Sequence, residues 1–211
     1  MSKVKICGLS RIADIEAVNA ALPDYIGFVF APSRRRVSAC DASMLKGRLD
    51  KRIKAVGVFV DADIETVAAL FRGGVIDLAQ LHGDEDESYI GQLKQLCGCP
   101  VIKAIGIGTM GGPGDTIMKA GTAHLYRNAD YLLFDTLSKQ RGGTGEVFDW
   151  GLLEGFGMKP YFLAGGLNPE NAGEAISRLA PYCVDVSSGV EAGGAKDAGK
   201  IHEFVRIARG L

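Results

Sequence analysis

The chain has 211 residues, 47% of them apolar, and a formal net charge of −1. This length is enough for one well-buried core and short for two domains. The near-neutral charge gives no reason to expect DNA, RNA or an anionic membrane surface as a partner. No apolar run approaches the ~20 residues that span a bilayer, and the N-terminus leads directly into a strand-like run rather than a signal peptide.

Cysteine usage indicates a reducing compartment. The five cysteines are an odd number and their spacing suggests no disulfide framework, so we expect a cytoplasmic protein. Cys97 and Cys99 could suggest a metal pair, but the three histidines lie far apart and share no ligand spacing with them. A turn at the end of a helix is the better interpretation. We therefore expect no metal and no cofactor.

The chain alternates strand-like and helix-like segments from end to end. Short apolar runs rich in Val, Ile, Leu and Phe are typical of parallel strands covered on both faces. They predict eight strands, near Val4–Cys7, Tyr25–Phe30, Ala55–Val60, Asp77–Leu81, Val101–Ile105, Tyr131–Asp135, Tyr161–Ala164 and Val184–Ser187.

Amphipathic stretches lie between these runs. Apolar residues keep helical spacing after Ser10, after Asp63 and after the acidic run at 84–87, where the helix macrodipole favours negative charge. Asn168 followed by Pro169 reads as a helix cap with proline in the first turn. A last helix is expected over about 196–209.

Eight strand-then-helix units in one domain over residues 1–211 predict an α/β fold, a single-domain (β/α)8 TIM barrel. An open doubly wound sheet is the structural alternative. It would usually carry a glycine-rich nucleotide turn after its first strand, and Cys7-Gly8-Leu9-Ser10 is not one. The glycine-rich stretch Gly106–Gly114 is expected to form an irregular loop after the fifth strand.

In this barrel the active site lies at the carboxyl ends of the strands. Glycines there let backbone N–H groups approach an anion, and serine hydroxyls add donors. Such residues follow the last two predicted strands, at Gly165-Gly166 and Ser187-Ser188-Gly189. Each could be an ordinary tight turn, but both together at these two strand ends favour a phosphate site. Gly142–Gly145 suits a flexible flap or a second backbone cradle, a weaker signal because such loops are common.

A thiol and a carboxyl stand at two further strand ends. A free cysteine is usually a small buried hydrophobe, but Cys7 should line the pocket if it points inward. Strand alternation puts Lys5 on the same side, where it needs a charged partner, and Asp185 on the neighbouring strand is a candidate. A nearby cation would help lower the thiol pKa from ~8.5 toward that of a usable base. For Asp135 the alternative is a helix cap, but Thr136 does not open a helix-like segment.

Taken together, the strand ends resemble the phosphoribosylanthranilate isomerase family, the (β/α)8 barrels of tryptophan biosynthesis. The resemblance runs the length of the chain, in order. The segments that carry it are Val4-Lys-Ile-Cys-Gly-Leu9, Gly27-Phe-Val-Phe30, Ser33-Arg-Arg-Arg-Val-Ser38, Gly57-Val-Phe-Val60, Leu78-Ala-Gln-Leu-His-Gly83, Phe134-Asp-Thr136, Gly142-Gly-Thr-Gly145, Phe148-Asp-Trp150, Leu163-Ala-Gly-Gly-Leu-Asn-Pro-Glu-Asn171, Val184-Asp-Val-Ser-Ser-Gly-Val-Glu191, Lys196-Asp197 and Lys200-Ile201.

The resemblance implies a cofactor-free Amadori rearrangement of N-(5-phosphoribosyl)anthranilate, a phosphorylated small molecule. It makes Asp135 the general acid that opens the ribose ring and Cys7 the general base that takes the C2 proton. Two groups on different strands of one barrel meet that need for an acid and a base.

The resemblance also implies the substrate contacts. Arg35 is expected to hold the anionic end of the substrate, although Arg34 or Arg36 could share or replace its role. Gln80 and Asp185 are expected to bind substrate too. The phosphate site is expected at Gly165, Gly166, Ser187, Ser188 and Gly189. Two rivals stay open, another phosphosugar isomerase or epimerase and a binding protein without turnover, and the oligomeric state could be a monomer or a homodimer.

Overall fold

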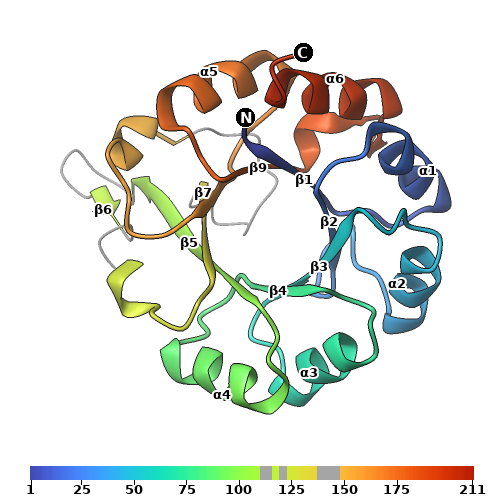
Figure 1. Ribbon diagram of the computed structural model, residues 1–211, viewed down its shortest axis with the longest axis vertical. Helices are drawn as coiled ribbons and strands as arrows, with labels where there is room; N and C mark the ends of the chain where they lie inside the picture. Colours follow the sequence, from blue (N-terminus) through green and yellow to red (C-terminus); the bar gives the residue numbers. More distant parts are fainter. Residues whose placement is uncertain (110–115, 119–122, 137–147) are drawn as a thin grey trace.

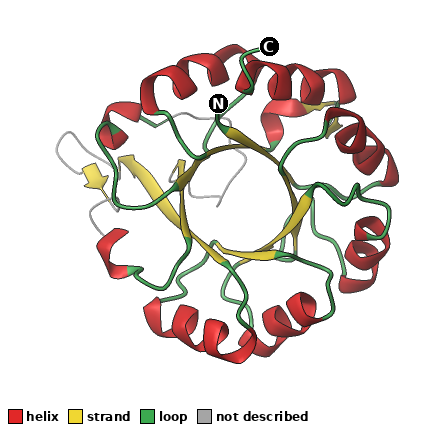
Figure 2. Ribbon diagram, in the orientation of Figure 1, coloured by secondary structure: helices red, strands yellow, loops and turns green. Residues whose placement is uncertain are grey.

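The structure is a computed structural model that describes residues 1–109, 116–118, 123–136 and 148–211. Eight parallel strands close into a ring with helices outside it (Figure 1, Figure 2). They are β1 (Lys3–Cys7), β2 (Tyr25–Val29), β3 (Lys54–Phe59), β4 (Leu78–Leu81), β5 (Val101–Thr109), β7 (Tyr131–Thr136), β8 (Tyr161–Leu163) and β9 (Cys183–Val186). Pairing of β9 with β1 and of β4 with β5 closes the barrel, which confirms the predicted TIM barrel.

The α-helices of the described residues are α1 (Ile12–Ala21), α2 (Ala39–Lys46), α3 (Ile64–Arg72), α4 (Glu87–Cys97), α5 (Pro169–Leu179) and α6 (Ala198–Ala208). The sequence did not single out α2, because only Ala42 and Leu45 of this short helix are buried. Its start is set by Ser38, whose hydroxyl accepts the Asp41 N–H while the Asp41 carboxylate accepts in return.

Two of the eight strand-then-helix units differ from the expectation in their described residues. In the described part of the chain, β5 and β7 are followed by 3₁₀ turns, at 123–125 and at η2 (Trp150–Leu153), where an α-helix was expected. Gly151, Gly155 and Gly157 lie in or just after η2, and glycine disfavours a longer helix.

The expected irregular loop after the fifth strand is also corrected in part. Gly106 to Thr109 belong to β5, which continues past its barrel partners and pairs antiparallel with β6 (Thr116–Met118). Extended pairing satisfies the backbone groups of this glycine-containing stretch, which sequence composition alone had assigned to a loop. Residues 110–114 of the predicted loop lie outside the described residues.

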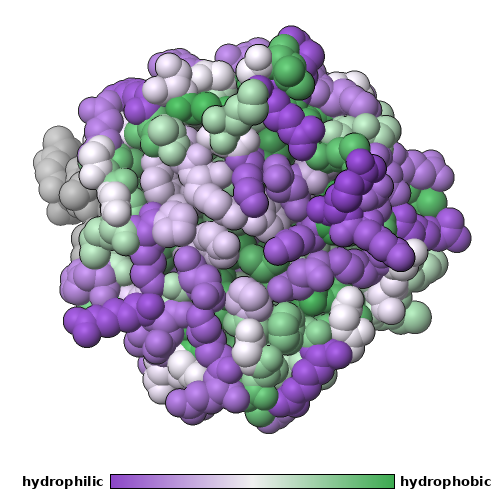
Figure 3. All heavy atoms as spheres, viewed as in Figure 1, coloured by the Kyte–Doolittle hydropathy of each residue, from purple (hydrophilic) through white to green (hydrophobic). Residues whose placement is uncertain are grey.

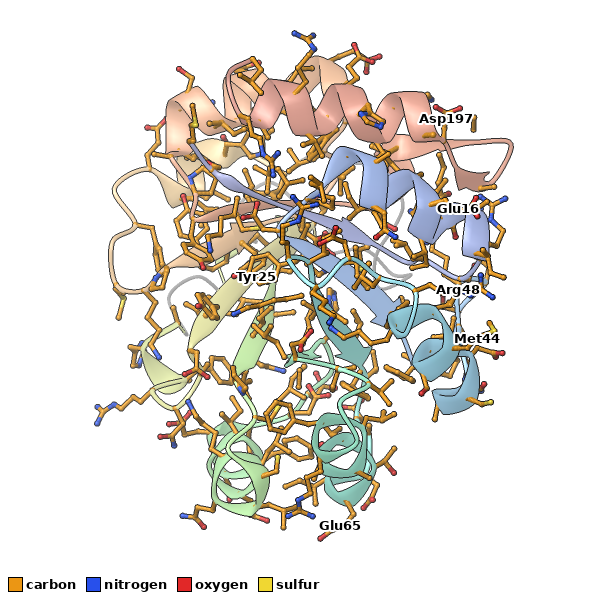
Figure 4. All side chains as sticks on the ribbon, turned by 45° about the vertical axis from the view of Figure 1, so that its right-hand side comes forward. Glu16, Tyr25, Met44, Arg48, Glu65 and Asp197 are labelled. Atoms are coloured by element: carbon orange, nitrogen blue, oxygen red, sulfur yellow. The ribbon has the colours of Figure 1, made fainter. Side chains whose placement is uncertain are left out.

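The barrel interior is a packed core of alternate strand residues. Tyr25 points into it from β2, in contrast to Glu16, Met44 and Glu65 on the outer helices (Figure 4). The buried residues of this interior cluster are Tyr25, Val56, Leu78, Ile102, Leu133, Phe162, Ala164 and Cys183. The layer begins at the amino-terminal ends of β2, β4 and β9, at Tyr25, Leu78 and Cys183, and reaches Ala164 just after β8.

A larger apolar cluster lies between the strands and the helices, and it includes Ile6, Phe28, Phe134 and Phe204. The face of the molecule in Figure 3 is mostly hydrophilic, with apolar side chains scattered between the polar ones. None of the helices that the structure describes is long and apolar enough to cross a bilayer.

Candidate active site at the carboxyl ends of the strands

The predicted catalytic groups lie on strands that share one mouth of the barrel. Cys7 is the last residue of β1, and Asp135 is the last but one of β7. In the order of pairing, β9 and β8 separate these two strands. Because all eight barrel strands are parallel, both side chains stand at the same end, on well-separated parts of its rim.

Cys7 is held by its neighbours on both sides. Its Sγ packs over Gly27 of β2, where a Cβ would come within 2.6 Å of the sulfur. The Ser187 hydroxyl donates to the Cys7 carbonyl oxygen at 3.0 Å. One layer deeper, the fully buried Lys5 Nζ donates to Asp185 Oδ2 at 2.7 Å, so the predicted Lys5–Asp185 pair is confirmed.

The nearby cation Lys5 lowers the pKa of the Cys7 thiol as expected, but the net pKa is raised and not lowered. Burial raises the pKa of Cys7 above its ordinary value, and the opposing effect of Lys5 and Lys196 does not outweigh it, partly because Asp185 adds to the rise. The sequence shows the nearby cation but not how far the sulfur is withdrawn from water. Burial therefore disfavours the thiolate, which is the form that a base must take.

Asp135 is linked to a polar chain inside the barrel. Its Oδ1 accepts the N–H of Thr136 at 2.8 Å, and its Oδ2 lies 3.4 Å from His82 Nε2. Gln80 Nε2 lies 2.8 Å from His82 Nδ1. If the Gln80 amide donates there, the His82 proton sits on Nε2 and faces Asp135. Sequence analysis did not include His82 in the site, although its place two residues after Gln80 puts both on one side of the chain.

A second buried ion pair holds the segment that carries His82. Lys103 Nζ donates to Glu85 Oε2 at 2.9 Å and to the Gly83 carbonyl at 2.8 Å. Glu85 in turn accepts the N–H groups of Gly83 and Asp61. Each carboxylate oxygen of Glu85 is thus bonded, and the loop after β4 is fixed beside Asp135.

The two loops expected to bind phosphate are in contact. Gly189 packs directly against the Leu167 carbonyl, which leaves no room for a side chain there. Gly165 and Gly166 have φ of +84° and +66°, and Asn171 Nδ2 donates to the Gly166 carbonyl at 3.0 Å. Ser187 and Ser188 lie where β9 passes into the short helix η3 (Ser188–Val190). The loops after β8 and β9 therefore form one continuous backbone surface.

We predict that Gly165→Ala lowers kcat by about 10- to 100-fold and destabilises the fold by about 1–3 kcal/mol. Its left-handed φ is strained for alanine, and the new Cβ would lie 2.7 Å from the Thr136 nitrogen and 3.2 Å from Asp135 Oδ1. Steady-state kinetics and thermal melting measure the two effects. Gly155→Ala, at φ +75° with nothing within 4 Å, is the control for strain alone. Equal kinetics in the two variants would contradict the prediction.

The three consecutive arginines differ in environment. The Arg35 side chain is 16% exposed and passes over Gly8, and its Nε and Nη2 donate to Glu191 at 2.7 and 3.1 Å. Arg34 is 57% exposed and donates to the same carboxylate at 2.6 Å. Arg36 is exposed. This geometry favours Arg35 as the arginine nearest the end of β1.

Glu191 and Lys196 are the residues that sequence analysis missed in this region. Lys196 Nζ donates to Glu191 Oε1 at 2.9 Å and to the Ser187 carbonyl at 2.8 Å. Burial alone would raise the pKa of Glu191, but hydrogen bonds from Arg35 and Lys196 outweigh it and lower the pKa to about 2. A sequence separation of 156 positions hides the pairing of Glu191 with Arg35 from any local pattern.

Two further predictions concern a metal site and the glycine-rich stretch after the sixth predicted strand. Among the described residues, no three His, Cys, Asp or Glu side chains are grouped to hold a metal ion. The glycine-rich stretch Gly142–Gly145, predicted to be a flap or a second cradle, lies outside the part of the chain that the structure describes.

A closed parallel barrel whose ionisable groups gather at the carboxyl ends of its strands is the architecture of a TIM-barrel enzyme. The sequence profile of the family described as "N-(5'phosphoribosyl)anthranilate (PRA) isomerase" matches residues 4–207. The chain therefore belongs to the N-(5'-phosphoribosyl)anthranilate isomerase family, as the resemblance of its strand ends indicated.

Individual relatives agree over the whole chain. The N-(5'-phosphoribosyl)anthranilate isomerase of Endomicrobium trichonymphae is 49% identical over 212 residues, covering 100% of both chains. The crystal structure of phosphoribosyl anthranilate isomerase from Thermotoga maritima matches with a TM-score of 0.89 and 35% identity over 100% of both chains. A further crystal structure of such an isomerase, at TM-score 0.85, 34% identity and 100% coverage of both, holds reduced 1-(o-carboxyphenylamino)-1-deoxyribulose 5-phosphate.

Proposed function

We propose that Cys7 and Asp135 carry out the proton transfers of the isomerisation that gives this family its name. The chain is an isomerase of tryptophan biosynthesis that converts N-(5-phosphoribosyl)anthranilate to 1-(2-carboxyphenylamino)-1-deoxyribulose 5-phosphate. The observation that carries the assignment is the position of a thiol and a carboxyl at one barrel mouth, on strands separated by two others. A substrate lying across the mouth would present its ring oxygen to one group and its C2 hydrogen to the other.

The reaction needs these two groups in sequence. Asp135, in its acid form, protonates the ribose ring oxygen, and the C1–O bond breaks to give a protonated Schiff base. Cys7, as thiolate, removes the C2 proton, and the electron pair moves to the nitrogen to give an enol-amine. Tautomerisation to the ketone gives the product without net oxidation. No residue of this scheme requires a bound metal or cofactor.

Two buried side chains offer unused acceptors for the substrate. Asp185 Oδ1 and Gln80 Oε1 have no hydrogen-bond partner within the described structure, although both atoms are buried. Hydroxyl groups of the sugar are suitable donors for them. This supports substrate binding by Gln80 and Asp185, with Asp185 also holding Lys5.

The phosphate of the substrate is proposed to bind the backbone surface of Gly165, Gly166, Ser188 and Gly189, with Ser187 beside it. Loops after the last two barrel strands, with a short extra helix, commonly hold phosphate in this fold. The carboxylate of the substrate is assigned to Arg35, the least exposed arginine of the cluster at the end of β1. We also propose that residues 1–211 act as one catalytic domain in the cytoplasm, as a monomer or homodimer.

The assay that tests the proposal is the loss of anthranilate-type fluorescence when freshly prepared phosphoribosylanthranilate meets the purified chain in EDTA. Decay well above the spontaneous rate is expected, and it should persist after prolonged chelation. A rate equal to the spontaneous one would overturn the assignment of substrate. Activity lost on chelation and regained with a divalent cation would instead favour a metal-dependent phosphosugar epimerase.

A further inference from the structure

The carboxylate of Glu191 lies at the centre of a charged cluster beside the mouth of the barrel. Three cations, Arg34, Arg35 and Lys196, surround it. Oε1 accepts from Arg35 Nε and Lys196 Nζ, and Oε2 accepts from Arg34 and from Arg35 Nη2. The cluster has three positive charges and one negative charge, so its surplus of positive charge favours an anionic ligand.

The cluster is built on a rigid hairpin. Glu191 and Lys196 stand opposite each other in the antiparallel pair β10 (Glu191–Ala192) and β11 (Ala195–Lys196). Gly193 and Gly194, at φ of +58° and +81°, make the two-residue turn between them. Arg11 Nη2 donates to the Lys196 carbonyl, and Lys200 Nζ to the Glu191 carbonyl. In Figure 4, Asp197 marks where this hairpin enters α6.

The residues of the cluster differ in exposure, and the difference indicates that Arg35 is the cation nearest the catalytic groups. Glu191 is 7% exposed and Lys196 2%, whereas Arg34 is 57% exposed. Glu191 therefore binds two little-exposed cations, the inner pair Arg35 and Lys196, and one exposed cation, Arg34. Of the inner pair, Lys196 is directed to the Ser187 carbonyl, and Arg35 crosses Gly8, the residue after Cys7.

The hydrogen bonds to Glu191 use one particular edge of the Arg35 guanidinium. They engage Nε and Nη2, the side-on edge, and among the described residues none engages Nη1. A guanidinium held by its side edge presents its end edge, Nη1 with the second Nη2 hydrogen, in a fixed plane. That edge matches the two oxygens of a carboxylate.

We propose that Glu191 is a positioning residue that orients Arg35 so that its end edge receives the carboxylate of the substrate. The inference rests on the proposed function and deepens it, because it states which residue makes Arg35 selective for a carboxylate. Glu191 itself does not touch the substrate. Glu191 is negatively charged like the substrate carboxylate, but it improves the binding of that carboxylate by orienting Arg35, which lies between them.

Removing the Glu191 charge should change ligand affinity in two opposite ways, and the two can be measured separately. Loss of a negative charge should strengthen binding of every anion through the general field. Loss of the orienting contact should weaken only a ligand that uses the end edge of Arg35. The probes are reduced 1-(2-carboxyphenylamino)-1-deoxyribulose 5-phosphate and the same compound made with aniline, which lacks the carboxylate.

For Glu191→Gln we expect the dissociation constant of the carboxylated probe to rise about tenfold, while that of the aniline probe changes less than about twofold. Turnover should show KM raised about tenfold with kcat within about threefold. In an Arg35→Lys background the same substitution should add little to the loss, since lysine has no edge to orient. Glu154→Gln, which breaks an exposed pair with Arg178, is the matched control and should change neither probe.

Unchanged or tighter binding of the carboxylated probe would overturn the proposal, and so would equal losses for the two probes. Equal losses would place Glu191 in support of the phosphate loop through Lys196. Thermal melting of each variant checks that the fold is retained. Failure of the wild-type chain to turn over phosphoribosylanthranilate would reject the proposed function, whereas wild-type turnover without the selective loss rejects the role of Glu191 alone.

Discussion

Replacement of Cys7 by alanine is expected to lower kcat by about 10²- to 10⁴-fold while binding of the reduced product analogue persists. Alanine removes the only proposed acceptor for the C2 proton and changes little in size, so the pocket should keep its shape. Single-turnover fluorescence and calorimetric titration measure the two quantities. Cys40→Ala, at an exposed free cysteine outside the cluster, should leave both unchanged.

The raised pKa of Cys7 adds a pH dependence to the same experiment. Burial disfavours the thiolate, and the thiolate is the active form of a base, so the active fraction grows as the pH rises toward the raised pKa. Because kcat/KM also needs the acid form of Asp135, which declines as the pH rises, the effect of the thiolate is expected in the rate of C2 deprotonation itself, which should increase with pH through the neutral range. A C2 deprotonation rate that is flat across this range, or Cys7→Ala with ordinary turnover, would exclude the thiol as the base.

The barrel could be predicted from sequence because its strands are short apolar runs in a regular alternation. Each predicted strand occurs in the structure, with its ends shifted by only a few residues. The errors fall where helical periodicity is weak or absent. Helix α2 buries only two residues, and the described residues 123–125 and 150–153 form 3₁₀ turns, which are too short for an apolar helical repeat to predict.

Parts of the candidate site that follow from strand alternation were also predictable. Lys5 lies two residues before Cys7, and its partner Asp185 lies on the strand that closes the barrel, so both were inferred correctly. The pairing of Glu191 with Arg35 was not, because it joins a hairpin after β9 to a loop after β2. The direction of the Cys7 pKa was missed for a related reason, since desolvation depends on three-dimensional packing.

Replacement of Asp135 by asparagine is expected to lower kcat by about 10²- to 10⁴-fold with a small change in analogue binding. Asparagine can keep the contact with the Thr136 N–H but has no acidic proton to give to the ribose ring oxygen. Asp130→Asn is a matched control at the other end of the same strand. Asp130 accepts from Lys94 and from the Val101 N–H, so that substitution should lower thermal stability and leave kcat nearly unchanged.

The position of His82 makes the outcome for Asp135 decisive. His82 Nε2 lies 3.4 Å from Asp135 Oδ2, so an acid role could in principle belong to either side chain. If Asp135 is the acid, His82→Asn should reduce kcat only modestly, because it removes a neighbour and not the proton donor. Substantial turnover in Asp135→Asn together with its loss in His82→Asn would reverse the assignment. The same pair of variants therefore identifies which member of the chain from Gln80 through His82 to Asp135 delivers the proton that opens the ring.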